Sequence, residues 1–166
     1  MIRHMDKVDK IVEQWNRELP DLDVSSMGLI GRFKQITQHL SLGMAKTFTE
    51  HGLNPANFDV LATLRRAGPP YALSPNELIA STMVTSGTMT NRIDQLTKAG
   101  LVERIQNPND RRSVVVSLTK KGFTIIDPTL KAHVATQSRL TSGLSKEESK
   151  QLNALLRKFL MSLEGQ

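Results

Sequence analysis

The sequence predicts a mainly α-helical fold with one small β-hairpin. Signals for two short helices lie between Ser74 and Gly100, with a break at residues 82–84 between them. Two short segments rich in apolar and β-branched residues, 101–105 and 114–118, follow and are separated by turn-forming residues. Two helices, a tight turn and a hairpin in this order form a winged helix-turn-helix, and longer amphipathic segments flank it on both sides.

The two central helices have defined ends in the sequence. Ser74 can cap the first helix, Pro75 needs no amide hydrogen in the first turn, and Glu77 completes a capping box. The second helix is expected from about residue 85 to 99 and ends before Gly100, because glycine readily adopts the left-handed conformation that follows a helix. Its apolar residues recur at intervals of four and three and should therefore face the core: Met89, Ile93 and Leu96.

The opposite face of the second helix suits the major groove of DNA. Small side chains at its start allow a helix to approach base edges closely, and polar side chains along it can form hydrogen bonds with those edges. We therefore expect this face to contact DNA through Ser86, Thr88, Thr90, Asn91, Gln95 and Lys98.

The segment between the two predicted strands carries two adjacent arginines. Residues 106–113 contain Asn, Pro and Asp, which predict a turn with Arg111 and Arg112 at its tip. An isolated Arg-Arg pair is usually solvated surface charge, but beside a helix that suits the major groove it favours contact with the neighbouring minor groove. Residues 54–121 also hold nine Lys and Arg against five Asp and Glu, the largest basic excess along the chain.

Apolar seams in the flanking helices predict a dimer. Residues 6–19 form an amphipathic stripe that includes the only tryptophan, Trp15, and residues 26–50 form a long helix with a continuous apolar seam. A capping box at Ser145 opens a final helix with a further seam. A single winged-helix module cannot cover seams of this length, so we expect a second copy of the chain to cover them. The predicted division is 1–53 for N-terminal dimerisation helices, 54–121 for the DNA-binding region and 122–166 for C-terminal dimerisation helices.

Composition excludes several classes of protein. The 166 residues contain no cysteine, so disulfides, thiolate metal sites and thiol-based redox sensing are excluded. The sequence has no segment resembling a signal peptide and no run of about 18 apolar residues. We therefore expect a soluble cytoplasmic protein without a membrane partner.

Enzymes and metalloproteins are poor matches to the sequence. There is no phosphate-binding glycine loop, nucleophile elbow or pair of catalytic acids, so no catalytic residue is expected. The four histidines, His4, His39, His51 and His133, lack the three- or four-residue spacing of helical zinc ligands. We therefore expect neither a metal site nor a cofactor.

The sequence resembles the MarR-type winged-helix regulators over nearly its whole length. The resemblance rests on residues 86–92 of the second helix, on 98–104, and on Asp110-Arg111-Arg112-Ser113 running into Leu118-Thr119. In that family an Asp-x-Arg motif in the wing holds an arginine for the minor groove, and Asp110 and Arg112 occupy those positions. The resemblance implies a homodimer that binds a double-stranded DNA operator and responds to a small-molecule effector.

Within this family, the chain resembles the urate-responsive branch of the PecS and HucR kind. That branch has an N-terminal helix with a tryptophan, an aspartate in the third helix, an arginine in the recognition helix and an arginine just after it, which here are Trp15, Asp59, Arg92 and Arg104. The resemblance implies that these four residues bind and sense urate or a related purine anion. The chemistry is plausible, because a flat anionic purine can stack on an aromatic ring and pair with a guanidinium.

Two other interpretations of function stay open. A MarR-type regulator can respond to a phenolic or aromatic acid instead of a purine. An architectural DNA-binding protein would share the basic wing but would not need Trp15 or Asp59. A thermal-shift series with purines separates this last class from a ligand-responsive repressor.

Overall fold

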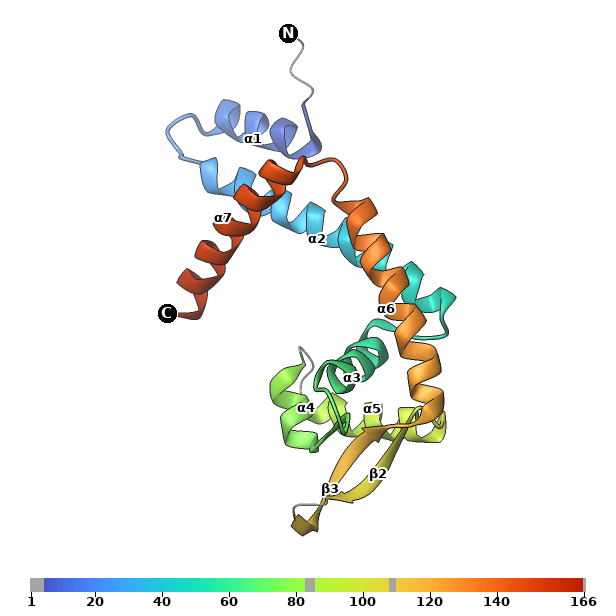
Figure 1. The fold of residues 1–166 in the computed structure, drawn as a ribbon. Helices are drawn as coiled ribbons and strands as arrows, with labels where there is room; N and C mark the ends of the chain where they lie inside the picture. The colour runs from blue at the N-terminus through green and yellow to red at the C-terminus, as the bar shows by residue number, and fades with distance from the viewer. Residues whose placement is uncertain (1–4, 83–85, 108–109, 166) are drawn as a thin grey trace. The chain divides into compact units, whose positions relative to one another are not determined.

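The chain is mainly helical with one small sheet, which confirms the predicted fold class. The computed structural model describes residues 5–82, 86–107 and 110–165. It divides into two compact units, Met1–Gly43 and Met44–Gln166. The three functional segments predicted above stay a prediction. Within the described residues the elements (Figure 1) are α1 (Lys7–Glu18), α2 (Ser25–Glu50), α3 (Pro55–Arg66), β1 (Ala72–Leu73), α4 (Pro75–Ser81), α5 (Ser86–Lys98), β2 (Val102–Asn107), β3 (Asp110–Leu118), α6 (Lys120–Leu140) and α7 (Lys146–Glu164).

The first unit pairs α1 with the first part of α2. Asp6 caps α1 by accepting a hydrogen bond from the backbone N–H of Asp9 at 2.8 Å. Val8 is buried, and a Cβ at Gly31 would lie 3.0 Å from Val8 Cγ1, so the glycine allows close approach of the two helices. Arg32 donates hydrogen bonds to Asp6 at 2.8 Å and to Asp9. One buried valine and one arginine with two carboxylates therefore hold α1 on α2.

The core of the second unit lies among α3, α4, α5, the sheet and α6. The inward face predicted for the recognition helix α5 is confirmed, because Met89, Ile93 and Leu96 are at most 2% exposed. The last turns of α2 also reach this core, since Phe48 stacks on Phe58 of α3 with ring centroids 4.2 Å apart. The other residues of the cluster with no exposed surface are Val60, Leu61, Leu64, Leu78, Val116 and Ile126.

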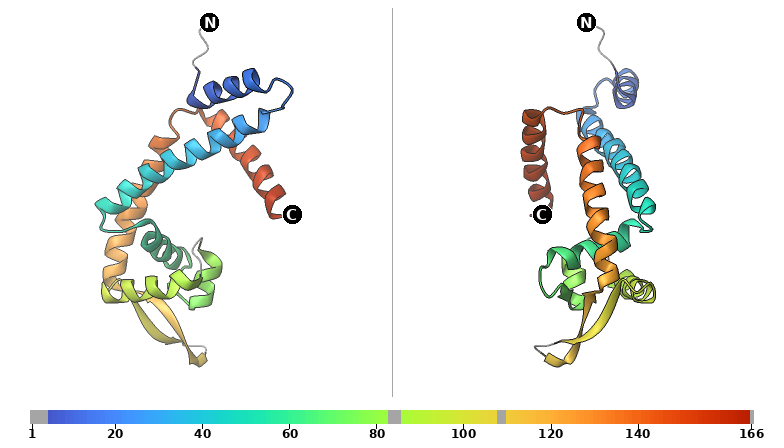
Figure 2. Two further views of the ribbon diagram at one scale, coloured as in Figure 1. Left: turned by 180° about the vertical axis from the view of Figure 1, so that it is seen from behind. Right: turned by 45° about the vertical axis from the view of Figure 1, so that its right-hand side comes forward.

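The sheet has one strand more than the sequence predicted and longer wing strands. Its antiparallel order is β1-β3-β2, with Leu73 opposite Val116 and Arg104 opposite the same Val116 on the other side. β1 was missed because two residues are too short for an alternating pattern. Both views of Figure 2 show β2 and β3 extending side by side away from α5. Because β3 begins at Asp110, the two arginines predicted for the turn instead lie in the first residues of that strand.

The C-terminal helix α7 begins as predicted. Ser145 Oγ accepts from the N–H of Glu148 at 3.2 Å, and Glu148 accepts from the N–H of Ser145 at 2.8 Å. These backbone and side-chain hydrogen bonds lower the pKa of Glu148. All residues of α7 are described, and none of them is buried. Its apolar seam is therefore exposed on this chain.

Candidate nucleic-acid interface and effector site

The face of α5 that points away from the core carries the residues predicted to contact DNA. Thr90, Asn91, Gln95 and Lys98 are exposed, and Thr88 is half-buried. The side chain of Ser86 lies outside the described part of the structure. Their exposure meets the geometric requirement for a major-groove contact, and their role in DNA binding stays a prediction.

The C-terminal end of α5 is fastened to the start of α6. Gly100 has φ +71°, a conformation that favours glycine, and its carbonyl oxygen accepts a hydrogen bond from Thr119 Oγ1 at 2.7 Å. Lys121 Nζ donates to the carbonyl oxygen of Ala99 at 2.8 Å, placing a cation at the negative end of the helix dipole. These contacts fix the recognition helix relative to the base of the wing.

Side-chain hydrogen bonds also organise the end of the wing. Asn107 Nδ2 donates to Ser113 Oγ at 3.0 Å, and Ser113 Oγ donates to the carbonyl oxygen of Asp110 at 3.0 Å. The strand register shifts between Gln106 and Asn107. The side chains of Arg111 and Arg112 lie outside the described part of the structure, so their predicted contact with the minor groove stays a prediction.

Asp59 lines a cavity of about 530 Å³ between α3 and α6. This volume falls in the range of small-molecule sites. Phe58, Ala62 and Leu130 contribute apolar surface. The remaining lining residues are ionisable: Arg65, Arg66, Asp127 and His133. The cavity therefore combines an aromatic wall with charged groups, as a site for a small aromatic ion requires.

His133 stands against the aromatic wall of this cavity. Its ring centroid lies 4.8 Å from that of Phe58 and 5.1 Å from that of Phe48. Burial lowers the pKa of His133 below its ordinary value of 6.5, so the imidazole is neutral near neutral pH. Its Nδ1 atom is buried and has no hydrogen-bond partner among the described residues.

The two arginines of the cavity have different partners. Arg65 Nε donates to Asp127 Oδ1 at 2.7 Å. The Arg65 guanidinium also lies 5.2 Å from the ring centroid of Tyr71 and 5.6 Å from that of Phe123. Arg66 Nη2 instead donates to the carbonyl oxygen of Ser81, at the end of α4.

The other predicted effector residues lie elsewhere. Arg92 is half-buried on α5, and its Nε has no hydrogen-bond partner among the described residues. Arg104 Nη2 donates to Asp94 Oδ1 at 2.6 Å and so joins β2 to α5. Trp15 belongs to the first unit and is 41% exposed. Of the four, only Asp59 is among the described residues that line the cavity.

Sequence reasoning missed Arg65, Arg66, Asp127 and His133 as cavity residues. One signal was present, because Asp59, Ala62 and Arg66 follow at three and four residues and so share a face of α3. Asp127 and His133 come from α6, more than 60 residues later in the chain, and only the tertiary fold brings them to α3.

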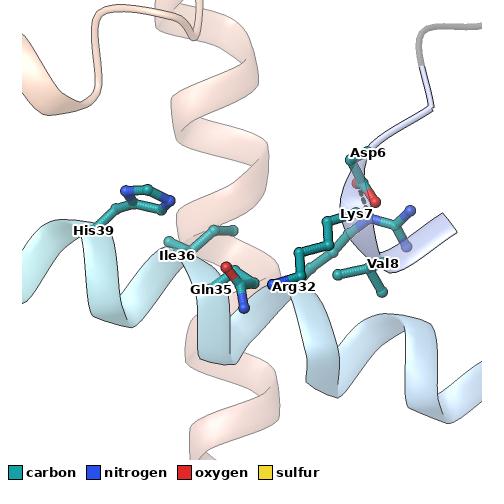
Figure 3. Close-up of a pocket in the computed structure, with 7 residues that line it drawn as sticks. All are labelled: Asp6, Lys7, Val8, Arg32, Gln35, Ile36 and His39. Atoms are coloured by element: carbon teal, nitrogen blue, oxygen red, sulfur yellow. Dashed lines mark hydrogen bonds and ion pairs between the residues drawn. The ribbon is translucent and has the colours of Figure 1, made fainter. Parts of the chain in front are cut away.

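A smaller cavity of about 290 Å³ lies in the first unit between α1 and α2. Figure 3 shows the Arg32 side chain directed at Asp6, with His39 farther along α2. Arg32 and Asp6 of this cavity thus serve the contact between the two helices. Throughout the described residues, no three His, Cys, Asp or Glu side chains are grouped as metal ligands. No helix in the same residues is long and apolar enough to cross a bilayer.

Comparison with known proteins points to DNA-binding regulators. The sequence profile of the MarR family matches residues 51–113. The chain is 40% identical over 156 residues to the HTH-type transcriptional regulator PecS of Dickeya dadantii (strain 3937), covering 94% of this chain and 93% of PecS. A MarR mutant from Escherichia coli complexed with operator DNA has a TM-score of 0.70 at 28% identity, covering 88% of this chain and 97% of that one. Bordetella bronchiseptica BpsR, whose DNA binding is regulated by 6-hydroxynicotinic acid, has a TM-score of 0.68 at 26% identity, covering 78% and 90%.

Proposed function

Because this chain belongs to the MarR family and is a DNA-binding transcriptional regulator, not an enzyme, we propose that it is a dimeric repressor whose DNA binding is attenuated by urate or a related purine anion. The cavity beside Asp59, within the unit that carries the recognition helix, is the observation that supports an effector most directly. Similarity to PecS over nearly the full length supports the choice of the urate-responsive branch.

Exposed apolar side chains on α7 support the dimer. Leu155 is 65% exposed and Leu160 and Leu163 are each 55% exposed, and the helical period places the three on one face of α7. A contiguous apolar face of this kind is unusual on a monomer and is covered readily by the same face of a second copy. A symmetric dimer spaces its two recognition helices by one helical turn, so the operator should be a pseudo-palindrome with half-site centres about 10 base pairs apart.

In this proposal each half-site is read by α5 and the wing of one subunit. The exposed face of α5 enters the major groove through Asn91, Gln95, Lys98 and the small residues before them. Arg112 reaches the neighbouring minor groove, where a guanidinium is attracted to the negative potential. Nothing in this step needs a cofactor.

The effector is proposed to act through four residues. Trp15 stacks on the purine and Arg104 pairs with its anionic edge, which requires the anion to compete with Asp94 for the guanidinium. The carboxylate of Asp59 then faces the negative charge of the bound purine. The resulting repulsion displaces the recognition helix through Arg92. A tenfold loss of DNA affinity needs only about 1.4 kcal/mol of coupling.

Fluorescence of Trp15 during a urate titration tests this assignment, because it is the only tryptophan in the chain. Urate should quench it at saturation in the wild type. Arg104→Ala should lose urate affinity and keep operator affinity, whereas Asp59→Asn should keep urate affinity and show a smaller loss of operator binding. The urate assignment is wrong if saturating urate neither quenches Trp15 nor changes operator affinity.

A phenolic or aromatic acid is the second candidate effector. The regulation of BpsR by 6-hydroxynicotinic acid favours this class in a structural relative, and the apolar wall of Phe58 and Leu130 suits any flat ring. The same titration with 6-hydroxynicotinate in place of urate decides between the two classes. A stronger loss of operator affinity with the pyridine acid would select it.

A further inference from the structure

Arg66, the last residue of α3, connects the effector cavity to the helix-turn-helix. Its side chain lines the cavity, and its Nη2 donates a hydrogen bond to the carbonyl oxygen of Ser81. Ser81 is the last residue of α4, and the recognition helix α5 begins five residues later at Ser86. One guanidinium therefore reaches both the cavity wall and the end of the helix that precedes the recognition helix.

The charge of Arg66 is less compensated than that of its neighbour Arg65. Arg65 is held by Asp127 at 2.7 Å and by two aromatic rings. In the part of the chain that the structure describes, no carboxylate forms an ion pair with Arg66, which is exposed. An incoming anion can therefore take Arg66 as its partner without displacing a carboxylate, whereas at Arg65 it would have to compete with Asp127.

The rest of the cavity determines the kind of anion. Phe58 and Leu130 offer apolar surface, and Phe48 stacks on Phe58. His133 is neutral near neutral pH because burial lowers its pKa, so it adds no second positive charge. A flat aromatic anion satisfies both features, since its ring covers the apolar wall while its negative edge forms a charge-assisted hydrogen bond with Arg66.

We propose that Arg66 forms a second contact with the anionic effector, in addition to the one proposed for Arg104, and that this contact replaces the hydrogen bond of Arg66 to Ser81. The proposal rests on the ligand response proposed above and adds a transmitting residue to it, separate from Asp59 and Arg92. Loss of the bond removes a hydrogen bond between α3 and the C-terminus of α4. The recognition helix, which follows directly, is then less firmly positioned for the major groove.

The required energy is small. A tenfold loss of operator affinity corresponds to about 1.4 kcal/mol. The free energy of one hydrogen bond from a charged donor is of comparable size. Exchange of the Arg66 hydrogen bond from Ser81 to the ligand is therefore sufficient for a tenfold effect. The effect is reciprocal, because operator binding that favours the Arg66–Ser81 bond must weaken effector binding by the same factor.

The test compares wild type, Arg66→Gln and Arg66→Lys, with urate and 6-hydroxynicotinate as probes. Calorimetry gives probe affinity, and operator titrations give the ratio of operator affinity without and with probe. Arg66→Gln should lower affinity for the active probe at least about tenfold and bring the ratio close to one. Arg66→Lys keeps the charge and should recover part of both quantities. Arg139→Gln, which removes an exposed arginine of α6 outside the cavity, is the matched control.

The outcomes separate this inference from the proposed function. The inference is wrong if the wild type responds to a probe and Arg66→Gln shows the same ratio of operator affinity without and with that probe. This outcome leaves the proposed function standing. The same holds if Arg66→Gln weakens operator binding equally with and without probe, because Arg66 would then support only the fold or the DNA contact. A wild type that responds to neither probe overturns both.

Discussion

The winged-helix core and the C-terminal helix α7 differ in whether their apolar residues are buried. Leu61, Leu64 and Leu78 have no exposed surface, whereas Leu155 and Leu163 of α7 are 65% and 55% exposed. Both regions have equally clear capping signals and apolar periodicity in the sequence. The difference shows that periodicity identifies an apolar face, but it does not say whether the same chain will cover that face.

This difference has an energetic consequence. Complete burial of a leucine side chain contributes roughly 1.5–3 kcal/mol, and most helical stability in proteins comes from packing of an apolar face. The DNA-binding core receives this stabilisation within one chain. The face of α7 receives it only when a partner covers it, so the stability of α7 should depend on protein concentration while that of the core should not.

The largest expected effect is in the core. Leu61→Ala should lower the free energy of unfolding by about 2–5 kcal/mol, because it leaves a cavity in a fully buried cluster. Chemical denaturation followed by circular dichroism measures this loss, which should not vary with protein concentration. A loss below about 1 kcal/mol would mean that the core is not packed as described.

The next effect concerns α7. Leu155→Glu places a charge in the proposed interface and should raise the dimer dissociation constant at least about a hundredfold. Sedimentation should give about twice 18.5 kDa for the wild type and a monomer for the variant at micromolar concentration. Arg157→Gln, on the same helix, controls for loss of a surface group that is not apolar. A monomeric wild type would contradict the dimer and the pseudo-palindromic operator together.

A smaller effect is expected at the wing. Arg112→Ala should cost about 1–3 kcal/mol of operator affinity and reduce the salt dependence of binding, because one fewer phosphate-associated counterion is released. Operator titrations at several salt concentrations measure both quantities. Arg17→Ala on α1 removes the same charge far from the wing in sequence and should change the affinity much less. Equal losses of operator affinity in the two variants would mean that Arg112 contributes only through its positive charge and not through a specific contact with the minor groove.

The smallest effect concerns pH and His133. Because burial lowers the pKa of the folded state below 6.5, the unfolded chain binds a proton at higher pH than the folded chain does. The contribution of His133 to the free energy of unfolding is therefore fully present above about pH 6.5. It is lost as the pH falls from there toward the pKa of the folded state. His133→Leu should therefore lose less unfolding free energy than wild type between about pH 7 and pH 5. Equal losses of unfolding free energy in the two proteins would mean that His133 does not cause the pH dependence.

Local signals in the sequence predicted the helices well. Ser74 with Glu77 and Ser145 with Glu148 act as caps, and Gly100 has the positive φ expected of a residue after a helix. Each of these depends on groups within a few residues of one another. Local chemistry therefore suffices to locate them.

The sequence could not predict contacts between distant residues. β1 is too short to show alternation, and the wing strands extend farther than their apolar residues because hydrogen bonding with the partner strand prolongs them. The pairs Arg65–Asp127 and Arg104–Asp94 join different elements, so no spacing along the chain reveals them. For the same reason, the cavity beside Asp59 emerged only from the fold.

The most direct test of the central claim is an operator titration with the dimeric wild-type protein, without and with saturating urate. An operator selected from a random-sequence pool supplies the DNA. We predict that the selected sites are pseudo-palindromic and that urate weakens their binding by about tenfold or more. Equal operator affinity with and without urate would contradict a urate-responsive regulator, and selection of single, asymmetric half-sites would contradict a symmetric dimer.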